Sequence, residues 1–192
     1  MSDITYQNPF LSTNSLKVLS LLAKYSDQEF YEREIARRLG ISNGSANMVL
    51  NDLYSEQYLS RQKKGNMCLY SFNVSDPVFS HFKIVINILL LRPLIKQLKR
   101  VSMRIVLFGS CARAEDHSKS DIDLFIVSDV KSKVLGIIKK YKFKKGFEGL
   151  IIEPAVFSPT ELLKSEKTDK EFLSLVSEGI VLWDRLAHED SF

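Results

Sequence analysis

Two aspartates separated by one residue lead into an apolar run. Asp121 and Asp123 flank Ile122, and the apolar residues 124–127 follow. Because side chains alternate along a strand, we expect both carboxylates to project from one face, about 6–7 Å apart, with Ile122 pointing into a core. Carboxylate oxygens are the hard ligands that Mg²⁺ prefers, and two such ions clamp the attacking and leaving oxygens of a phosphoryl-type displacement. The spacing suits metal-assisted chemistry on a phosphate ester, whereas the alternative for an isolated Asp-x-Asp pair is the solvated end of a strand.

A Gly-Ser turn precedes these aspartates. Residues 103–108 form an apolar run that predicts a buried strand, and Gly109 and Ser110 follow it directly. Without a Cβ, Gly109 lets the backbone approach phosphate oxygens closely, and Ser110 adds a hydroxyl and an amide donor. Arg113 is placed to add positive charge. This turn is a candidate phosphate-binding loop.

The joint pattern, FGSCARAEDHSKSDIDLFIV, resembles the nucleotidyltransferase signature of the DNA polymerase beta superfamily, in its minimal form. The resemblance implies a mixed sheet flanked by helices, with Gly109 and Ser110 as the triphosphate loop and Asp121 and Asp123 as ligands for two Mg²⁺ ions. ATP or another NTP is the implied substrate. One position departs from the family, where Gly often follows the Ala-Arg pair and this chain has Ala114. If the loop needs a positive φ there, alanine costs about 1 kcal/mol.

The resemblance also implies a third carboxylate on a later strand, which activates the acceptor hydroxyl or holds the catalytic metal. Glu153 is the candidate, because apolar residues flank it within 147–157. Glu148 competes but lies near a turn with glycines on both sides. The alternative is that Glu153 is a structural residue beside Pro154.

The remaining pattern supplies the elements that must position these residues. Between the aspartates and Glu153, the apolar spacing over 131–141 predicts a helix. Two further helices are expected over 159–164 and 169–177, and residues 178–184 predict a closing strand. The resemblance implies that these elements form one domain over residues 102–192, with a mixed sheet flanked by helices, in a chain whose fold class we expect to be α+β.

The first part of the chain reads as helices and then a hairpin. Apolar residues over 16–23 predict a helix that Ser12 or Asn14 would cap. A second helix over 32–39 should stop at Gly40, and Ser42 should cap a third that runs to about Gln57. Residues 58–72 form two extended runs around a Gly-Asn turn, which is typical of a β-hairpin.

This arrangement suits double-stranded DNA. The third helix offers short polar groups for base edges in a major groove. The basic side chains of the hairpin, together with Arg37 and Arg38, could contact phosphates on either side of that groove. The candidate contacts are Asn43, Ser45, Asn47, Asn51, Arg61, Lys63 and Lys64. The segment resembles a winged helix-turn-helix domain over residues 12–73. The alternative is that these are solvated helix faces of a dimerisation or protein-docking module.

The chain has 192 residues, with 27 basic and 23 acidic side chains and a net charge of +4. Residues 1–75 carry a charge of +1, residues 76–104 carry +5, and residues 105–192 carry −2. The positive surplus therefore lies in the middle segment. We predict a DNA-binding domain over 1–75, a basic helical connector over 76–101 and a nucleotidyltransferase domain over 102–192.

The composition favours the cytoplasm. Two cysteines cannot build a disulfide framework or a four-thiolate zinc site, and the first residues lack a secretory signal pattern. The apolar run 84–91 is much shorter than the ~20 residues of a spanning helix, so no membrane partner is expected. The apolar face of residues 82–98 could form a homodimer or a domain core.

Taken together, the chain resembles prokaryotic transcriptional regulators that join a winged helix to a minimal nucleotidyltransferase. The implied activity is Mg²⁺-dependent transfer of a nucleotidyl group from an NTP to a hydroxyl on a protein, a nucleic acid or a small molecule. One alternative is a regulator that senses a nucleotide without transferring it, which Ala114 and the uncertain third acid favour. Another is an antitoxin-like partner of a separate protein.

Overall fold

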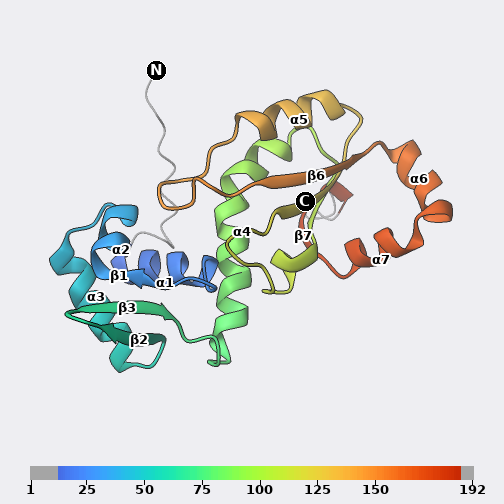
Figure 1. The fold of residues 1–192 in the computed structure, drawn as a ribbon. Coiled ribbons are helices and arrows are strands. Elements are labelled where there is room, and N and C mark those ends of the chain that lie inside the picture. The colour runs from blue at the N-terminus through green and yellow to red at the C-terminus, as the bar shows by residue number, and fades with distance from the viewer. Residues whose placement is uncertain (1–12, 187–192) are drawn as a thin grey trace, which may run out of the picture. The chain divides into compact units, whose positions relative to one another are not determined.

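A computed structural model describes residues 13–186 of the chain. These residues divide into two compact units (Figure 1). The first unit includes the residues up to Leu89 together with the short segment Lys144–Glu148. The second unit includes Leu90–Phe143 and the residues from Gly149 onward. The domain boundaries expected from the sequence stay a prediction.

The first unit joins three helices to a small antiparallel sheet. Its elements are α1 (Asn14–Lys24), β1 (Phe30–Tyr31), α2 (Glu32–Leu39), α3 (Asn43–Ser55), β2 (Leu59–Lys64) and β3 (Met67–Phe72). The strand order is β1-β3-β2, and the hairpin closes at the Lys64–Met67 pair, so the Gly-Asn turn lies where the sequence predicts it. The apolar faces of the helices form the core, with Val18, Ile35 and Leu50 fully buried.

The helix ends follow local sequence signals, with two exceptions. Gly40 ends α2 at a φ of 66°, and the Ser42 hydroxyl accepts the Ser45 N–H at the start of α3, as predicted. Thr13, rather than Asn14, caps α1, whereas Ser12 lies outside the described residues. The helix α3 ends at Ser55 rather than near Gln57.

The early end of α3 has a clear backbone cause. Gln57 has a φ of 64°, a left-handed conformation that cannot continue a right-handed helix. The N–H of Gln57 donates to the carbonyl of Tyr54, and the N–H of Tyr58 donates to that of Leu53. This pair of bonds is the Schellman motif, which usually has glycine in the left-handed position. The sequence therefore carries no glycine to mark this helix end.

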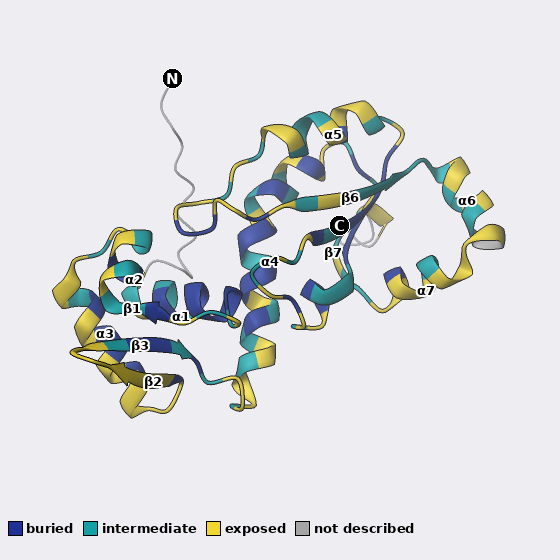
Figure 2. Cartoon of the chain, viewed as in Figure 1, coloured by how far each residue is buried: buried dark blue, intermediate teal, exposed yellow. Residues whose placement is uncertain are grey.

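The helix α4 (Val78–Leu98) is the long connecting helix of the chain. Among residues 13–186 it is the one helix long and apolar enough to cross a membrane, with a mean hydropathy of 1.6. The apolar run 84–91 was expected to be too short to span a membrane, but the whole helix is long enough. Figure 2 colours several positions along this helix as buried. In its first half, two of the buried residues are polar, Lys83 and Asn87. The Lys83 ammonium donates to the Ser26 hydroxyl at 2.9 Å, and the Lys24 ammonium donates to Oδ1 of the Asn87 side chain at 3.1 Å.

The second unit is built on a four-stranded mixed sheet. Its elements after α4 are β4 (Arg104–Leu107), the 3₁₀ turn η2 (Gly109–Ala112), β5 (Ile122–Val127), α5 (Lys131–Lys140), β6 (Ile152–Phe157), α6 (Pro159–Thr168), α7 (Lys170–Ser177) and β7 (Ile180–Asp184). The strand order is β6-β5-β4-β7. The strand β5 pairs parallel with β6 and antiparallel with β4, and β4 pairs antiparallel with β7. This is the α+β class and the mixed sheet expected from the sequence.

Buried apolar side chains hold this sheet and its helices together. Val106 in β4 and Phe125 and Val127 in β5 pack with Val176 of α7. Phe172 of α7 adds an aromatic contact, with its ring centroid 5.8 Å from that of Phe157. Because the two central strands are buried on both faces, their sequences are almost continuously apolar. The exception in β5 is Asp123, a half-buried polar residue among buried apolar ones.

Candidate active site

The strands β5 and β6 bring two of the predicted acids together. Asp123 and Glu153 are register partners across the parallel pair, and neighbouring strands lie about 4.8 Å apart. Paired residues on adjacent strands point to the same side of a sheet, so the two carboxylates share one face. Ile122 and Leu124 are buried on the opposite face, as predicted. The acids thus lie side by side where β5 and β6 begin.

The turn after β4 closes on the same place. Gly109 has a φ of +68°, and the Phe108 N–H donates to the Asp123 carbonyl at 3.2 Å. A Cβ built on Gly109 would lie only 2.3 Å from Oδ2 of Asp123. No side chain fits between this turn and the carboxylate, so both the backbone angle and the close approach require glycine. The candidate phosphate loop therefore lies directly against a candidate metal ligand.

The charged residues around Asp123 shift the pKa of its carboxyl. Burial raises the pKa of the Asp123 carboxyl, the negative charges of Asp121 and Glu153 raise it further, and the Arg113 guanidinium lowers it. Arg113 also forms an ion pair with Glu115, with 2.9 Å between Nε and Oε2. Three carboxylates that repel one another create a local potential that attracts a cation.

The loop between the turn and β5 is held by its own backbone. The Ser110 carbonyl accepts the N–H groups of Arg113 and Glu115, and the buried Cys111 thiol donates to the Asp121 carbonyl at 3.6 Å. Ala114 has a φ of 61°, so the loop does need a positive φ where the sequence supplies alanine. That conformation costs a residue with a Cβ about 1–2 kcal/mol. Cys111 thus supports the loop from inside, a contact that sequence spacing alone did not indicate.

The structure corrects the predicted position of Asp121 and separates Glu148 from the other candidate acids. Asp121 does not lie on a strand, because β5 begins at Ile122, and its side chain is exposed just before the sheet. Glu148, the competing third acid, belongs to the first unit, where its Oε2 accepts the Gly146 N–H at 2.8 Å. Glu153 is the later acid that the structure pairs with Asp123.

The donor set fits a hard divalent cation. Across residues 13–186 the structure holds no group of three or more His, Cys, Asp or Glu side chains already arranged to bind a metal ion. The residues in place are nevertheless carboxylates, and their mutual repulsion at Asp123 favours a bound cation. Oxygen donors of this kind suit Mg²⁺ better than the softer transition metals.

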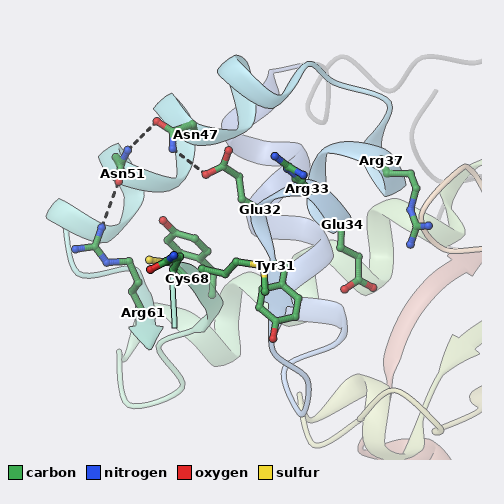
Figure 3. Close-up of a pocket in the computed structure, with 12 residues that line it drawn as sticks. Tyr31, Glu32, Arg33, Glu34, Arg37, Asn47, Asn51, Arg61 and Cys68 are labelled. Atoms are coloured by element: carbon green, nitrogen blue, oxygen red, sulfur yellow. Dashed lines mark hydrogen bonds between the residues drawn. The ribbon is translucent and has the colours of Figure 1, made fainter. Parts of the chain in front are cut away.

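The predicted DNA-contacting residues lie in the first unit, and the structure brings together only some of them. A groove of about 860 Å³ contains Asn47 and Asn51 from α3 and Arg61 from β2 (Figure 3). The groove also contains residues that sequence reasoning did not select, among them Tyr31, Glu32 and Tyr70. Polar spacing on α3 could not identify them, because they come from other elements.

The other predicted contacts lie outside this groove. Asn43 is exposed in the first turn of α3, Ser45 is tied to the Ser42 hydroxyl, and Lys63 and Lys64 are exposed along β2. Arg37 lines the groove, whereas the Arg38 guanidinium bonds to Glu34 and lies over the Phe30 ring. The hairpin thus presents its basic side chains to solvent beside a polar groove.

Comparison with known proteins bears on the second unit. No curated protein and no solved structure matches the chain significantly. The family comparison does find a match, and it covers β4, β5 and β6 with all the candidate site residues between Gly109 and Glu153. Residues 90–176 match the family described as the nucleotidyltransferase domain.

Proposed function

We propose that the second unit is a nucleotidyltransferase that moves a nucleotidyl group from ATP or another NTP to a hydroxyl acceptor, with Mg²⁺. The observation that carries the proposal is the pairing of Asp123 with Glu153 directly beside Gly109. One loop that admits phosphate and two neighbouring acids are the parts that such a transfer needs. The family match over residues 90–176 supports the same reaction class.

In the proposed reaction, each residue has a defined task. The Gly109–Ser110 turn donates backbone and hydroxyl hydrogens to the triphosphate, and Arg113 adds positive charge. Asp121 and Asp123 would hold Mg²⁺, which offsets the charge of the phosphates when bound. Glu153, whose side chain is exposed to an incoming acceptor, accepts the hydroxyl proton or shares the metal. The acceptor oxygen bonds to the α-phosphorus as the bond to pyrophosphate breaks.

Label transfer from α-labelled ATP tests this proposal. The wild-type chain should transfer label to itself, to duplex DNA or to RNA, and Asp121→Ala/Asp123→Ala should not. Asp129→Ala is the matched control, because this exposed acid follows β5 at its other end. All three proteins should show the same circular dichroism. Wild-type transfer no higher than that of the double variant, across all acceptors, would contradict the proposed activity.

Nucleotide sensing without transfer is the second candidate function. Ala114 supports it, because this chain has alanine at a position of positive φ where nucleotidyltransferases often have glycine. Calorimetry that detects Mg-ATP binding while no labelled product forms would support sensing. An antitoxin-like role would appear as a stable complex with a separate protein when the chain is purified from its own source.

We further propose that the first unit is a winged helix-turn-helix domain that binds double-stranded DNA. The helix α3 presents polar side chains, and five of the six residues of β2 are exposed, including Lys63 and Lys64. Lys63→Glu/Lys64→Glu should weaken duplex binding and flatten its dependence on salt, because fewer counterions are released. The matched double charge reversal is Lys164→Glu/Lys170→Glu, on exposed lysines of the second unit. Equal binding by both double variants would contradict a role for the hairpin.

The proposal places the chain in the cytoplasm without a membrane partner. Within residues 13–186, no disulfide joins Cys68 and Cys111. A homodimer is the assembly that DNA binding through two half-sites would need. Sedimentation with and without duplex DNA measures it directly.

A further inference from the structure

A continuous chain of hydrogen bonds runs through the groove of the first unit (Figure 3). The Asn47 amide nitrogen donates to Oε2 of Glu32 at 2.8 Å. The Asn51 amide nitrogen donates to Oδ1 of Asn47 at 3.1 Å. Nη1 of Arg61 donates to Oδ1 of Asn51 at 3.4 Å. These hydrogen bonds thus link α2, two successive turns of α3 and the hairpin.

The two ends of this chain fix its direction. An ionised carboxylate such as Glu32 can only accept, and a guanidinium such as Arg61 can only donate. Each asparagine between them must therefore direct its nitrogen toward Glu32 and its oxygen toward Arg61, since a flipped amide would place like groups together. Arg61 is itself held in place, with its guanidinium carbon 4.1 Å from the centre of the Tyr54 ring.

Each amide keeps part of its hydrogen-bonding capacity. Asn47 and Asn51 each use one N–H and one oxygen lone pair in the chain, which leaves one N–H and one lone pair. In the major groove adenine presents an acceptor, N7, beside a donor, the N6 amino group, whereas guanine presents two acceptors. A carboxamide with one free donor and one free acceptor matches adenine and mismatches guanine.

We propose that Asn47 and Asn51 read adenine in the major groove, and that Glu32 and Arg61 are positioning residues that hold the two amides in the reading orientation. The proposal rests on the proposed binding of duplex DNA by the first unit and specifies what that unit recognises. Both amides are exposed on α3, so a base edge can reach them without displacing a packed side chain.

Selection from random duplexes by the full chain tests the adenine assignment. The wild-type protein should enrich sites with defined adenines, and Asn47→Ala and Asn51→Ala should each lose the preference at one of them. Asn14→Ala is the control, because Asn14 lies on α1 outside the groove. Replacement of the recognised adenine by 7-deazaadenine, which still pairs with thymine but lacks N7, should weaken wild-type binding by about five- to 150-fold.

The positioning role needs a separate readout. Arg61→Lys keeps the charge and Glu32→Gln keeps the size, but neither variant fixes the orientation of the two asparagine amides as firmly. Each variant should bind duplex DNA while its preference for adenine over guanine falls, at an unchanged melting temperature. A purely structural role would instead lower the melting temperature and leave the base preference intact.

The possible failures are distinguishable. If the wild-type chain enriches no duplex, the proposed DNA binding is wrong and the adenine assignment falls with it. If duplexes are enriched but Asn47→Ala and Asn51→Ala keep every base preference, the assignment alone is wrong. Equal wild-type affinity for adenine and 7-deazaadenine would also overturn the assignment alone, and this comparison needs no variant to fold.

Discussion

Replacement of Gly109 by alanine would place a methyl group against the Asp123 carboxylate in the candidate active site. The new Cβ would lie 2.3 Å from Oδ2 and 3.1 Å from Cγ of Asp123, in a residue whose φ is +68°. The carboxylate would have to move by about 1 Å to restore an ordinary contact. Gly109→Ala should therefore lower both the stability of the second unit and the activity of the site.

The size of the stability loss follows from three contributions. A left-handed φ costs alanine about 1–2 kcal/mol, and a displaced Asp123 rotamer costs roughly 0.5–1.5 kcal/mol. The lower entropy of the unfolded alanine chain offsets about 0.4–1 kcal/mol. We expect the free energy of unfolding to fall by about 0.5–3 kcal/mol. A carboxylate displaced by about 1 Å should also reduce nucleotidyl transfer roughly 10²-fold.

Urea unfolding followed by tryptophan fluorescence measures the effect in the correct unit. The chain has one tryptophan, Trp183, and it lies in β7 beside β4. Gly136→Ala is the matched control, because Gly136 lies within α5 with nothing within 4 Å of its added Cβ. That change should stabilise the unit by about 0.5–1 kcal/mol. An unfolding free energy for Gly109→Ala equal to that of the wild type would refute the reasoning.

Three further changes have signs that the structure determines. Ala114→Gly should raise the unfolding free energy by about 0.5–1 kcal/mol, because the relieved left-handed strain exceeds the added chain entropy. Burial raises the pKa of Tyr141 from 10.0 to about 12. Since the unfolded phenol loses its proton first, stability should fall from pH 10 to 12, and Tyr141→Phe should flatten that fall. A hydrogen bond from Lys131, with two more from Ser158, lowers the pKa of Glu161 from 4.5 to about 2. That stability is present above pH 4.5 and is lost as the pH falls toward 2, so Glu161→Gln should flatten the acid limb.

The urea midpoint as a function of pH measures the last two effects, and the wild-type curve at neutral pH is the common reference. An alkaline limb that Tyr141→Phe leaves as steep as in the wild type would show that other groups control it. An acid limb unaffected by Glu161→Gln would show that its contact with Lys131 does not persist in solution. A loss of stability in Ala114→Gly would mean that the loop is not strained at that residue.

Local signals in the sequence predicted most of the first unit. Gly40 and Ser42 marked the turn between α2 and α3, because a left-handed residue and a side-chain cap act within a few residues. The end of α3 escaped prediction, since Gln57 occupies the left-handed position where glycine is usual. The network through the groove escaped it as well, because Glu32 and Arg61 meet the asparagines only through tertiary structure.

The candidate active site divides in the same way. The spacing of Asp121 and Asp123 and the turn at Gly109 are local patterns, and a motif could identify them. The apolar residues around Glu153 already favoured it over Glu148, but its pairing with Asp123 depends on the parallel register of β5 with β6, which no short pattern encodes. The sequence could not show whether the loop has a positive φ at Ala114, and the structure shows that it does.

The buried lysines of the first unit allow local unfolding of that unit to be followed by chemical labelling. Lys24 and Lys83 are 0% and 1% exposed, whereas Lys63 and Lys64 on the hairpin are exposed to solvent. An amine-acylating reagent should modify the hairpin lysines at once and reach the buried pair only when α1 and α4 separate. Peptide mass spectrometry over a time course would then report the free energy of that local opening, with the exposed lysines as internal references in the same molecule.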